Sequence, residues 1–189
     1  MDFWILDEFK QFINVVDKPD VKLAFNILFW TGIRIGELMA LTVKDIYTKK
    51  SLIDINKTYT KINDEEIITE PKTPKSKRIV YIPDFLCNDI DNYIKSLYRI
   101  ENNERIFSFA KTYLGKQLKK YAAIADVKKI RVHDLRHSHA SLLINMDVNV
   151  LTISERLGHE KVDTTWNTYS HLYPNNQLEV IQRLEFIES

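Results

Sequence analysis

Residues 51–83 read SLIDINKTYTKINDEEIITEPKTPKSKRIVYIP. Within them, short segments of β-branched and other apolar residues alternate with turn-forming Asn, Asp, Pro, Lys and Ser residues, a pattern typical of short β-strands. The strands are expected at about 51–55, 57–62, 65–70 and 78–83. We therefore predict a small antiparallel sheet at about 51–83, whose last connection is the basic loop 71–77.

The chain on both sides of this sheet has helical periodicity. Apolar residues recur at helical spacing from Leu6 to Val16, with Asp7 as the expected N-cap. An apolar helix spans about 21–30 and ends at Gly32, a residue suited to a left-handed cap. Further helices are expected at about 35–41, 84–100, 111–124, 134–145, 150–157, 162–170 and 176–187. The predicted class is mostly α with a small antiparallel β-sheet, an α+β fold.

Length and composition fit one soluble domain. The 189 residues, 44% of them apolar, are enough for a single hydrophobic core. No apolar run approaches the roughly 18 residues of a membrane span, and the acidic start of the chain does not resemble a secretory signal. A single cysteine, Cys87, excludes an internal disulfide and a Cys-rich metal site. We therefore expect a cytoplasmic protein with no membrane partner.

The net charge of +1 argues by itself against a nucleic-acid partner, but the charges are unevenly distributed. Residues 71–80 contain no acidic residue, and residues 111–136 are rich in Lys and Arg, whereas residues 1–20 and 84–104 lean acidic. Because a phosphate backbone responds to the local field, a near-neutral chain can still present one basic face. Charged faces that are merely solvated remain the alternative.

A first candidate for phosphate chemistry is Arg34, in the segment TGIRIGEL. Gly32 and Gly36 flank it close to a helix start, so backbone and guanidinium can approach one anion, and Arg binds phosphate in a bidentate manner. Glu37 either holds this guanidinium or supports the helix. The alternative is a packing corner with Arg34 exposed.

The second candidate is Lys72 in the basic loop. A lysine at a hairpin tip can reach a substrate as a proton donor or phosphate contact. Lys75, Lys77 and Arg78 compete for the same role. An ordinary exposed turn lysine is the alternative.

The third candidate is the pair His133 and Arg136 in HDLRHSH, where Asp134 is the expected N-cap. Residues three apart share one side of a helix, so an acid–base group and a clamp can address the same phosphate. His133 and His137 also have the i, i+4 spacing of a metal-binding pair, but the segment lacks an HExxH signature and a carboxylate cluster. His137 and His139 are interpreted as structural or supporting residues.

The fourth candidate comprises His159, in Leu157-Gly158-His159, and Tyr169 ten residues later. A tyrosine has a pKa near 10 and needs a positive or hydrogen-bonding site to attack phosphate. Taken alone, Tyr169 is better explained as an ordinary core or surface residue, since the chain has nine tyrosines.

In this order the segments resemble the motifs of the tyrosine recombinase (phage integrase) family. TGIRIGEL looks like its first arginine motif, HDLRHSHAS its His-x-x-Arg motif, LGH its second histidine motif and TTWNTYSHL its nucleophile motif. KTPKSKR resembles the lysine hairpin more loosely, and its KTxxSxR form favours Lys72. The resemblance covers about residues 20–175 and implies the catalytic-domain fold of the family. The wording of the motifs is most similar to integrases of phages, genomic islands and conjugative transposons.

The resemblance implies a DNA integrase or recombinase that acts through a 3′-phosphotyrosine. Tyr169 attacks the scissile phosphate of double-stranded DNA and releases a 5′-hydroxyl. Arg34 and Arg136 stabilise the non-bridging oxygens, and Lys72 protonates the leaving oxygen.

The two candidate histidines, His133 and His159, are expected to hydrogen-bond the phosphate, with His133 favoured for assisting deprotonation of Tyr169. The 5′-hydroxyl of a second strand then reverses the step. The cationic groups take the place of a metal, so neither a metal nor another cofactor is expected.

The same resemblance bears on domains and assembly. We expect residues 1–189 to form a single catalytic domain, with the core-binding and arm-binding domains of the family absent. The tail helix at about 175–187 is expected to dock on a neighbouring protomer in a homotetramer on DNA, and packing on its own domain is the alternative. Accessory DNA-bending or directionality factors are possible partners.

Three rival functions remain open at this point. A non-catalytic DNA-binding module would leave Tyr169 inert. A type IB topoisomerase-like enzyme would use the same nucleophile to relax supercoils. A metal-dependent hydrolase would use His133, His137 and His159.

Overall fold

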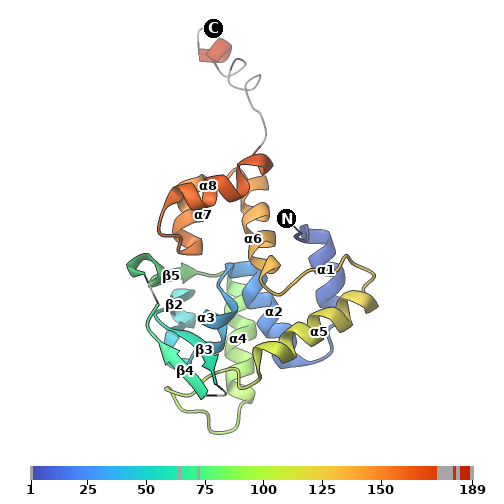
Figure 1. Ribbon diagram of the computed structural model, residues 1–189, viewed down its shortest axis with the longest axis vertical. Coiled ribbons are helices and arrows are strands. Elements are labelled where there is room, and N and C mark those ends of the chain that lie inside the picture. Colours follow the sequence, from blue (N-terminus) through green and yellow to red (C-terminus); the bar gives the residue numbers. More distant parts are fainter. Residues whose placement is uncertain (1, 64, 72, 174–180, 182–183, 188–189) are drawn as a thin grey trace.

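The computed structural model describes residues 2–63, 65–71, 73–173, 181 and 184–187. Among residues 2–173, as far as they are described, three α-helices lead into a strand-rich segment, and five further α-helices follow it (Figure 1). The predicted class, a mostly α chain of the α+β type with a small antiparallel β component, is therefore confirmed.

The helices carry most of the architecture. They are α1 (Leu6–Asn14), α2 (Pro19–Thr31), α3 (Ile35–Ala40), α4 (Asp84–Ser96), α5 (Lys111–Ile124), α6 (Asp134–Asn145), α7 (Val150–Leu157) and α8 (Val162–Tyr169). Short 3₁₀ turns cover Val43–Asp45, Thr48–Lys50, Pro74–Ser76 and Ser170–Leu172. The ranges predicted for α5, α6 and α7 are confirmed, whereas the helix predicted at 84–100 ends at Ser96. Most of the predicted tail helix lies outside the described residues, although 181 and 184–187 are helical.

The N-terminal caps differ from the prediction. Asp7 and Asp134 both lie inside the first turn of their helices, and the cap positions are Ile5 and His133. In α1, the carboxylate of Glu8 accepts the backbone N–H of Ile5 at 2.9 Å. The carboxylate of Asp134 accepts the backbone N–H three residues earlier in the same way, at 2.7 Å. An acidic side chain within the first turn thus satisfies a free donor, as the Glu of a capping box does.

The strands form two antiparallel sheets, so the prediction of one sheet is wrong. The first sheet has the order β1 (Ile46–Tyr47), β2 (Leu52–Ile55), β5 (Arg78–Tyr81), and the second pairs β3 (Thr58–Ile62) with β4 (Glu65–Thr69). The central strand β2 is largely buried and pairs with β5, whereas β3 and β4 form a largely exposed hairpin between them in sequence. Strand propensity predicts which segments form strands, but burial in the hydrophobic core determines which strands pair with each other.

Buried residues form a large core, a smaller one at the far end of α6 and a third cluster of Met39, Ala40 and Tyr59. The large core joins α1, α2 and the first sheet to α4, α5 and the start of α6. The smaller core contains Ala140 and Ile144 of α6, Ile153 and Leu157 of α7, and Tyr169 of α8. Figure 1 shows α7 and α8 beside the upper half of α6, away from α4 and α5. Helix α6 therefore fixes the position of α8 relative to the rest of the molecule.

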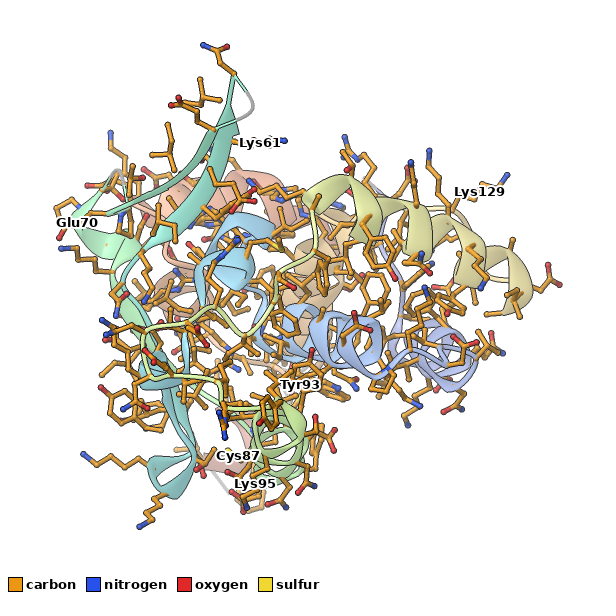
Figure 2. The ribbon with its side chains drawn as sticks, turned by 90° about the horizontal axis from the view of Figure 1, so that it is seen from below. Lys61, Glu70, Cys87, Tyr93, Lys95 and Lys129 are labelled. Carbon is orange, nitrogen blue, oxygen red and sulfur yellow. The ribbon has the colours of Figure 1, made fainter. Side chains whose placement is uncertain are left out.

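Figure 2 shows Lys61 of β3 and Lys129, beyond α5, on the side opposite Lys95 of α4. The segment 111–129 has several exposed lysines. In the described part of the chain, none of the helices combines the length and apolar character that crossing a membrane requires.

Candidate active site

Arg34 lies between the left-handed turn at Gly32, where φ is 67°, and the first turn of α3. Its guanidinium NH1 donates to Glu37 at 2.9 Å and its NH2 donates to the carbonyl of Gly158 at 3.2 Å. The backbone N–H of Arg34 also donates to Glu37, at 2.9 Å. The Arg34 side chain is 37% exposed whereas Glu37 is 3% exposed, so a buried carboxylate holds a cation that solvent can reach.

Arg136 comes from α6 and is almost completely buried. Its NH1 donates to the carbonyl of Gly32 at 2.7 Å, while its NH2 is buried and has no hydrogen-bond partner among the described residues. Burial, together with the nearby charges of Arg34 and Arg78, lowers the pKa of Arg136 to about 9. An unsatisfied buried donor is costly. An anion bound beside Arg136 would accept a hydrogen bond from the unpaired NH2 group. It would also offset the repulsion between Arg136 and the two nearby arginines.

Tyr169 is the last residue of α8, and its hydroxyl oxygen lies 2.8 Å from Nδ1 of His137. Burial raises the pKa of Tyr169 to about 12, and the charge of Arg136 opposes this increase. The ring of His137 also meets the ring of His133 edge to face, with 5.3 Å between centroids. The structure thus places His137, which was interpreted as a supporting residue, in hydrogen-bond contact with the tyrosine hydroxyl.

His159 follows the turn that ends α7, where Gly158 has a φ of 68°. Its Nδ1 lies 2.7 Å from the hydroxyl of Thr165, which orients the ring. Burial, followed by the charges of Arg136 and Arg34, lowers the pKa of His159 to about 4. His159 is therefore a neutral group in a positive field.

A cleft of about 450 Å³ lies beside Arg34 and His159. Arg34, Glu37, Gly158 and His159 line it. The other lining residues are Thr58 and Thr60 of β3, Pro71, Thr73 and Ser76 of the basic loop, and Glu160 and Thr164, which follow His159 in the chain. The cleft thus lies where four of the candidate motifs meet, with Thr164 contributed by the motif that contains Tyr169.

Lys72 lies outside the described residues and stays a prediction. Its neighbours Pro71 and Thr73 line the cleft. Of the competing residues, Lys77 pairs with exposed Glu70 at 2.8 Å. Arg78 points inward instead and forms a buried ion pair with Glu37, so it is not a hairpin-tip residue.

The charges of the site are unbalanced. The charges of Arg34 and Arg78 lower the pKa of Arg136 and Glu37 opposes them, while Glu160 adds a second acidic side chain to the lining of the cleft. Arg136 also acts on the pKa values of His133, His137 and His159. Among the described residues, no three His, Cys, Asp or Glu side chains gather in a way that could hold a metal ion. The arrangement is a cluster of positive charge suited to an anion, and its buried member Arg136 acts electrostatically on the buried Tyr169.

Comparison with known proteins identifies the family of the chain. The model of the phage integrase family matches residues 5–176. The ICEBs1 integrase of Bacillus subtilis strain 168 is 34% identical over 200 residues, which covers 98% of this chain and 54% of that protein. The tyrosine recombinase XerA of Saccharolobus solfataricus is 30% identical, covering 88% of this chain and 52% of that protein. The chain therefore spans about half the length of the curated relatives it matches.

Solved structures show the same fold. A Tn1549 transposon integrase in complex with a circular intermediate DNA superposes with a TM-score of 0.81 at 18% identity, covering all of this chain and 66% of that one. The catalytic domain of bacteriophage HP1 integrase has a TM-score of 0.67 at 22% identity, covering 97% of this chain and 94% of that domain. Together with the family match over residues 5–176, these likenesses establish that the chain belongs to the phage integrase family of tyrosine recombinases.

Proposed function

We propose that this chain is the catalytic domain of a site-specific DNA recombinase that cleaves and rejoins strands through a 3′-phosphotyrosine at Tyr169. The observation that carries the proposal is the position of the Tyr169 hydroxyl beside His137, within the field of the buried and incompletely paired Arg136. Burial disfavours the phenolate, and Arg136 is the group that opposes this effect. Arg34 and His159 line the cleft, whereas Arg136 and Tyr169 do not, so we propose that a phosphodiester held by Arg34 and His159 also reaches the unpaired guanidinium and the nucleophile when it binds.

The proposed cleavage step exchanges one phosphoester for another. The Tyr169 oxygen bonds to phosphorus as the bond from phosphorus to the 5′-oxygen breaks. The phenolic proton passes to His137, whose lowered pKa keeps the ring neutral and able to accept it near pH 7. The departing 5′-oxygen takes a proton from Lys72, a role that rests on the family resemblance. A second strand's 5′-hydroxyl reverses these steps, so the reaction needs no external energy source.

Arg34 and Arg136 are proposed to hold the non-bridging oxygens while charge builds up on them. Removing one preorganised donor of this kind typically slows catalysis by about 10²–10³-fold. His133 and His159 are proposed to hydrogen-bond the same phosphate. Relative to the expectation from sequence, His137 replaces His133 as the group nearest the nucleophile.

The proposed partner is double-stranded DNA, the ligand of the Tn1549 integrase to which the fold is similar. We propose that residues 1–189 act as one catalytic domain in the cytoplasm, since the chain matches 94% of the HP1 integrase catalytic domain in fold. The tail residues Ile181, Leu184, Phe186 and Ile187 are each at least half exposed. This exposure supports docking of the tail on another protomer of a DNA-bound homotetramer. Accessory DNA-bending or directionality factors stay predictions.

The decisive experiment is trapping on a nicked suicide duplex, in which loss of a short strand prevents religation. The wild-type chain should become covalently joined to the 3′-phosphate, and peptide mapping should identify Tyr169 as the joined residue. The Tyr169→Phe variant should form no adduct while binding DNA almost as tightly as the wild type. An adduct on another residue, or none from any folded preparation, would overturn the proposal.

The same assay separates the rival functions. Relaxation of supercoiled plasmid by the protein without strand exchange between duplexes would favour a type IB topoisomerase-like activity. Loss of cleavage on adding a chelator would favour a metal-dependent hydrolase. Binding that is unaffected by Tyr169→Phe, combined with no covalent product from the wild type, would indicate a DNA-binding module.

A further inference from the structure

Arg78, the first residue of β5, contacts three other segments that meet at the cleft. Its Nε donates to the carbonyl of Arg156 in α7 at 2.7 Å. Its NH1 donates to the carbonyl of Ser76, in the basic loop, at 3.1 Å. Both terminal nitrogens donate to Glu37 in α3, at 3.1 and 3.0 Å. Four of the five guanidinium donors are thus used inside the protein, which leaves Arg78 little capacity to bind substrate itself.

The carboxylate of Glu37 is shared between two arginines with different exposures. Its Oε1 accepts from the NH1 atoms of Arg34 and Arg78, and its Oε2 accepts from the Arg34 backbone and from NH2 of Arg78. Burial raises the pKa of Glu37, but the hydrogen bond and charge of Arg78, followed by Arg34, outweigh burial and lower it. Arg78 therefore keeps Glu37 ionised and in one orientation, and Glu37 in turn holds Arg34.

Arg78 also packs against the turn that carries His159. A Cβ atom added at Gly158 would lie 2.8 Å from NH1 and 3.0 Å from Cδ of Arg78. The carbonyl of the same glycine accepts a hydrogen bond from NH2 of Arg34. The guanidinium of Arg78 thus lies against one side of this turn while Arg34 bonds to its carbonyl.

We propose that Arg78 is a positioning residue that holds Arg34, the basic loop and the His159 turn in one mutual arrangement, without touching substrate. This inference rests on the proposed function. A buried ion pair has a desolvation cost that a buried apolar pair lacks, so it adds little to stability by itself. Its directional hydrogen bonds fix geometry, however, and a displacement of about 1 Å at a reacting group can slow catalysis by about 10²-fold. Arg78 should therefore affect the rate of cleavage far more than DNA binding.

The test uses Arg78→Lys, which keeps the charge but cannot make the same forked contacts. The single-turnover rate of adduct formation at saturating suicide duplex should fall by about 10–100-fold, while the dissociation constant for intact duplex changes less than about threefold. Arg105→Lys is the matched control, because Arg105 also pairs with a glutamate, Glu66, but does not line the cleft. This control should leave both quantities close to the wild-type values.

A double-variant cycle distinguishes positioning through Arg34 from a general loss of structure. If Arg78 acts through Arg34, the variant Arg34→Lys/Arg78→Lys should be no more than about threefold slower than Arg34→Lys alone. Rates that multiply, or a folded Arg78→Lys protein that cleaves as fast as the wild type, would overturn the inference. If Arg78→Lys does not fold, Glu37→Gln takes its place in the same cycle and must give the same non-additive result. Failure of the wild type to form a Tyr169 adduct would instead refute the proposed function.

Discussion

The Nδ1 atom of His137 lies 2.8 Å from the hydroxyl oxygen of Tyr169, at the smaller core formed by α6, α7 and α8. Tyr169 is only 1% exposed, so its hydroxyl has little access to water and has the His137 ring as its hydrogen-bond partner. Under the proposed function, we expect the phenolic proton to stay on Tyr169 when the site is empty and to pass to His137 when the tyrosine attacks phosphate. His137 would then act both as a hydrogen-bond partner and as a general base.

We predict that His137→Asn slows adduct formation on the nicked duplex by about 10²-fold or more, because positioned general bases contribute rate factors of this size. The measurement is the single-turnover rate at saturating DNA. His171→Asn is the matched control, since His171 is exposed two residues beyond Tyr169. Equal rates for His137→Asn and the wild type would remove His137 from the reaction and return the role to His133.

The pH dependence of cleavage tests the same assignment independently. Burial lowers the pKa of His137 from its usual value and raises that of Tyr169 to about 12. A neutral His137 accepts the proton, so the rate should be flat between about pH 7 and pH 8, below the pKa of about 9 of Arg136, and should fall as pH drops through the lowered histidine pKa. A reaction that begins from preformed phenolate would accelerate about tenfold per pH unit across that range. Single-turnover rates from about pH 5 to pH 9 decide between these outcomes.

Sequence reasoning located most of the elements because local signals determine them. The apolar periodicity of 111–124 and 134–145 depends on residues within one helix, and those ranges match α5 and α6. The pairing of β2 with β5 depends instead on burial of Ile53 against the core and joins segments more than twenty residues apart. The strand pattern of 51–83 contains no local signal for that choice, so one sheet was expected where two are present.

The same distinction applies to the site. Arg34, His133, Arg136, His159 and Tyr169 could be proposed because motif order identifies them. The contact of His137 with Tyr169 spans 32 positions and that of Arg78 with Glu37 spans 41, so neither could be inferred from local spacing. The i, i+4 spacing of His133 and His137 was the available signal, since it places both rings on one side of α6. That spacing was weighed as a metal-binding pair, and its relation to Tyr169 emerges only from the packing of α8.

Arg136 is expected to cost the empty protein stability. Its buried guanidinium has one nitrogen without a partner and lies near two other arginines, although it does donate to the carbonyl of Gly32. We predict that Arg136→Met abolishes adduct formation and raises the free energy of unfolding in the absence of DNA by about 1 kcal/mol, as seen when buried charges are replaced by apolar groups of similar size. Urea unfolding measures the second quantity. A loss of several kcal/mol would mean that the contact with Gly32 outweighs the burial of charge.

Gly158 and Gly115 form a matched pair for testing the turn that carries His159. Gly158 has a φ of 68°, and an added Cβ would meet Arg78 at 2.8 Å, whereas a Cβ at Gly115 in α5 would have no neighbour within 4 Å. Gly158→Ala should therefore lower the free energy of unfolding by about 1–3 kcal/mol and should also slow cleavage, because the methyl group displaces Arg78. Gly115→Ala should raise that free energy by about 0.5–1 kcal/mol through its better helix propensity and leave cleavage unchanged. If Gly158→Ala lost stability and still cleaved at the wild-type rate, the close packing of Arg78 against this turn would serve stability only. The geometry of the pocket would then depend on Arg34 and Glu37 alone.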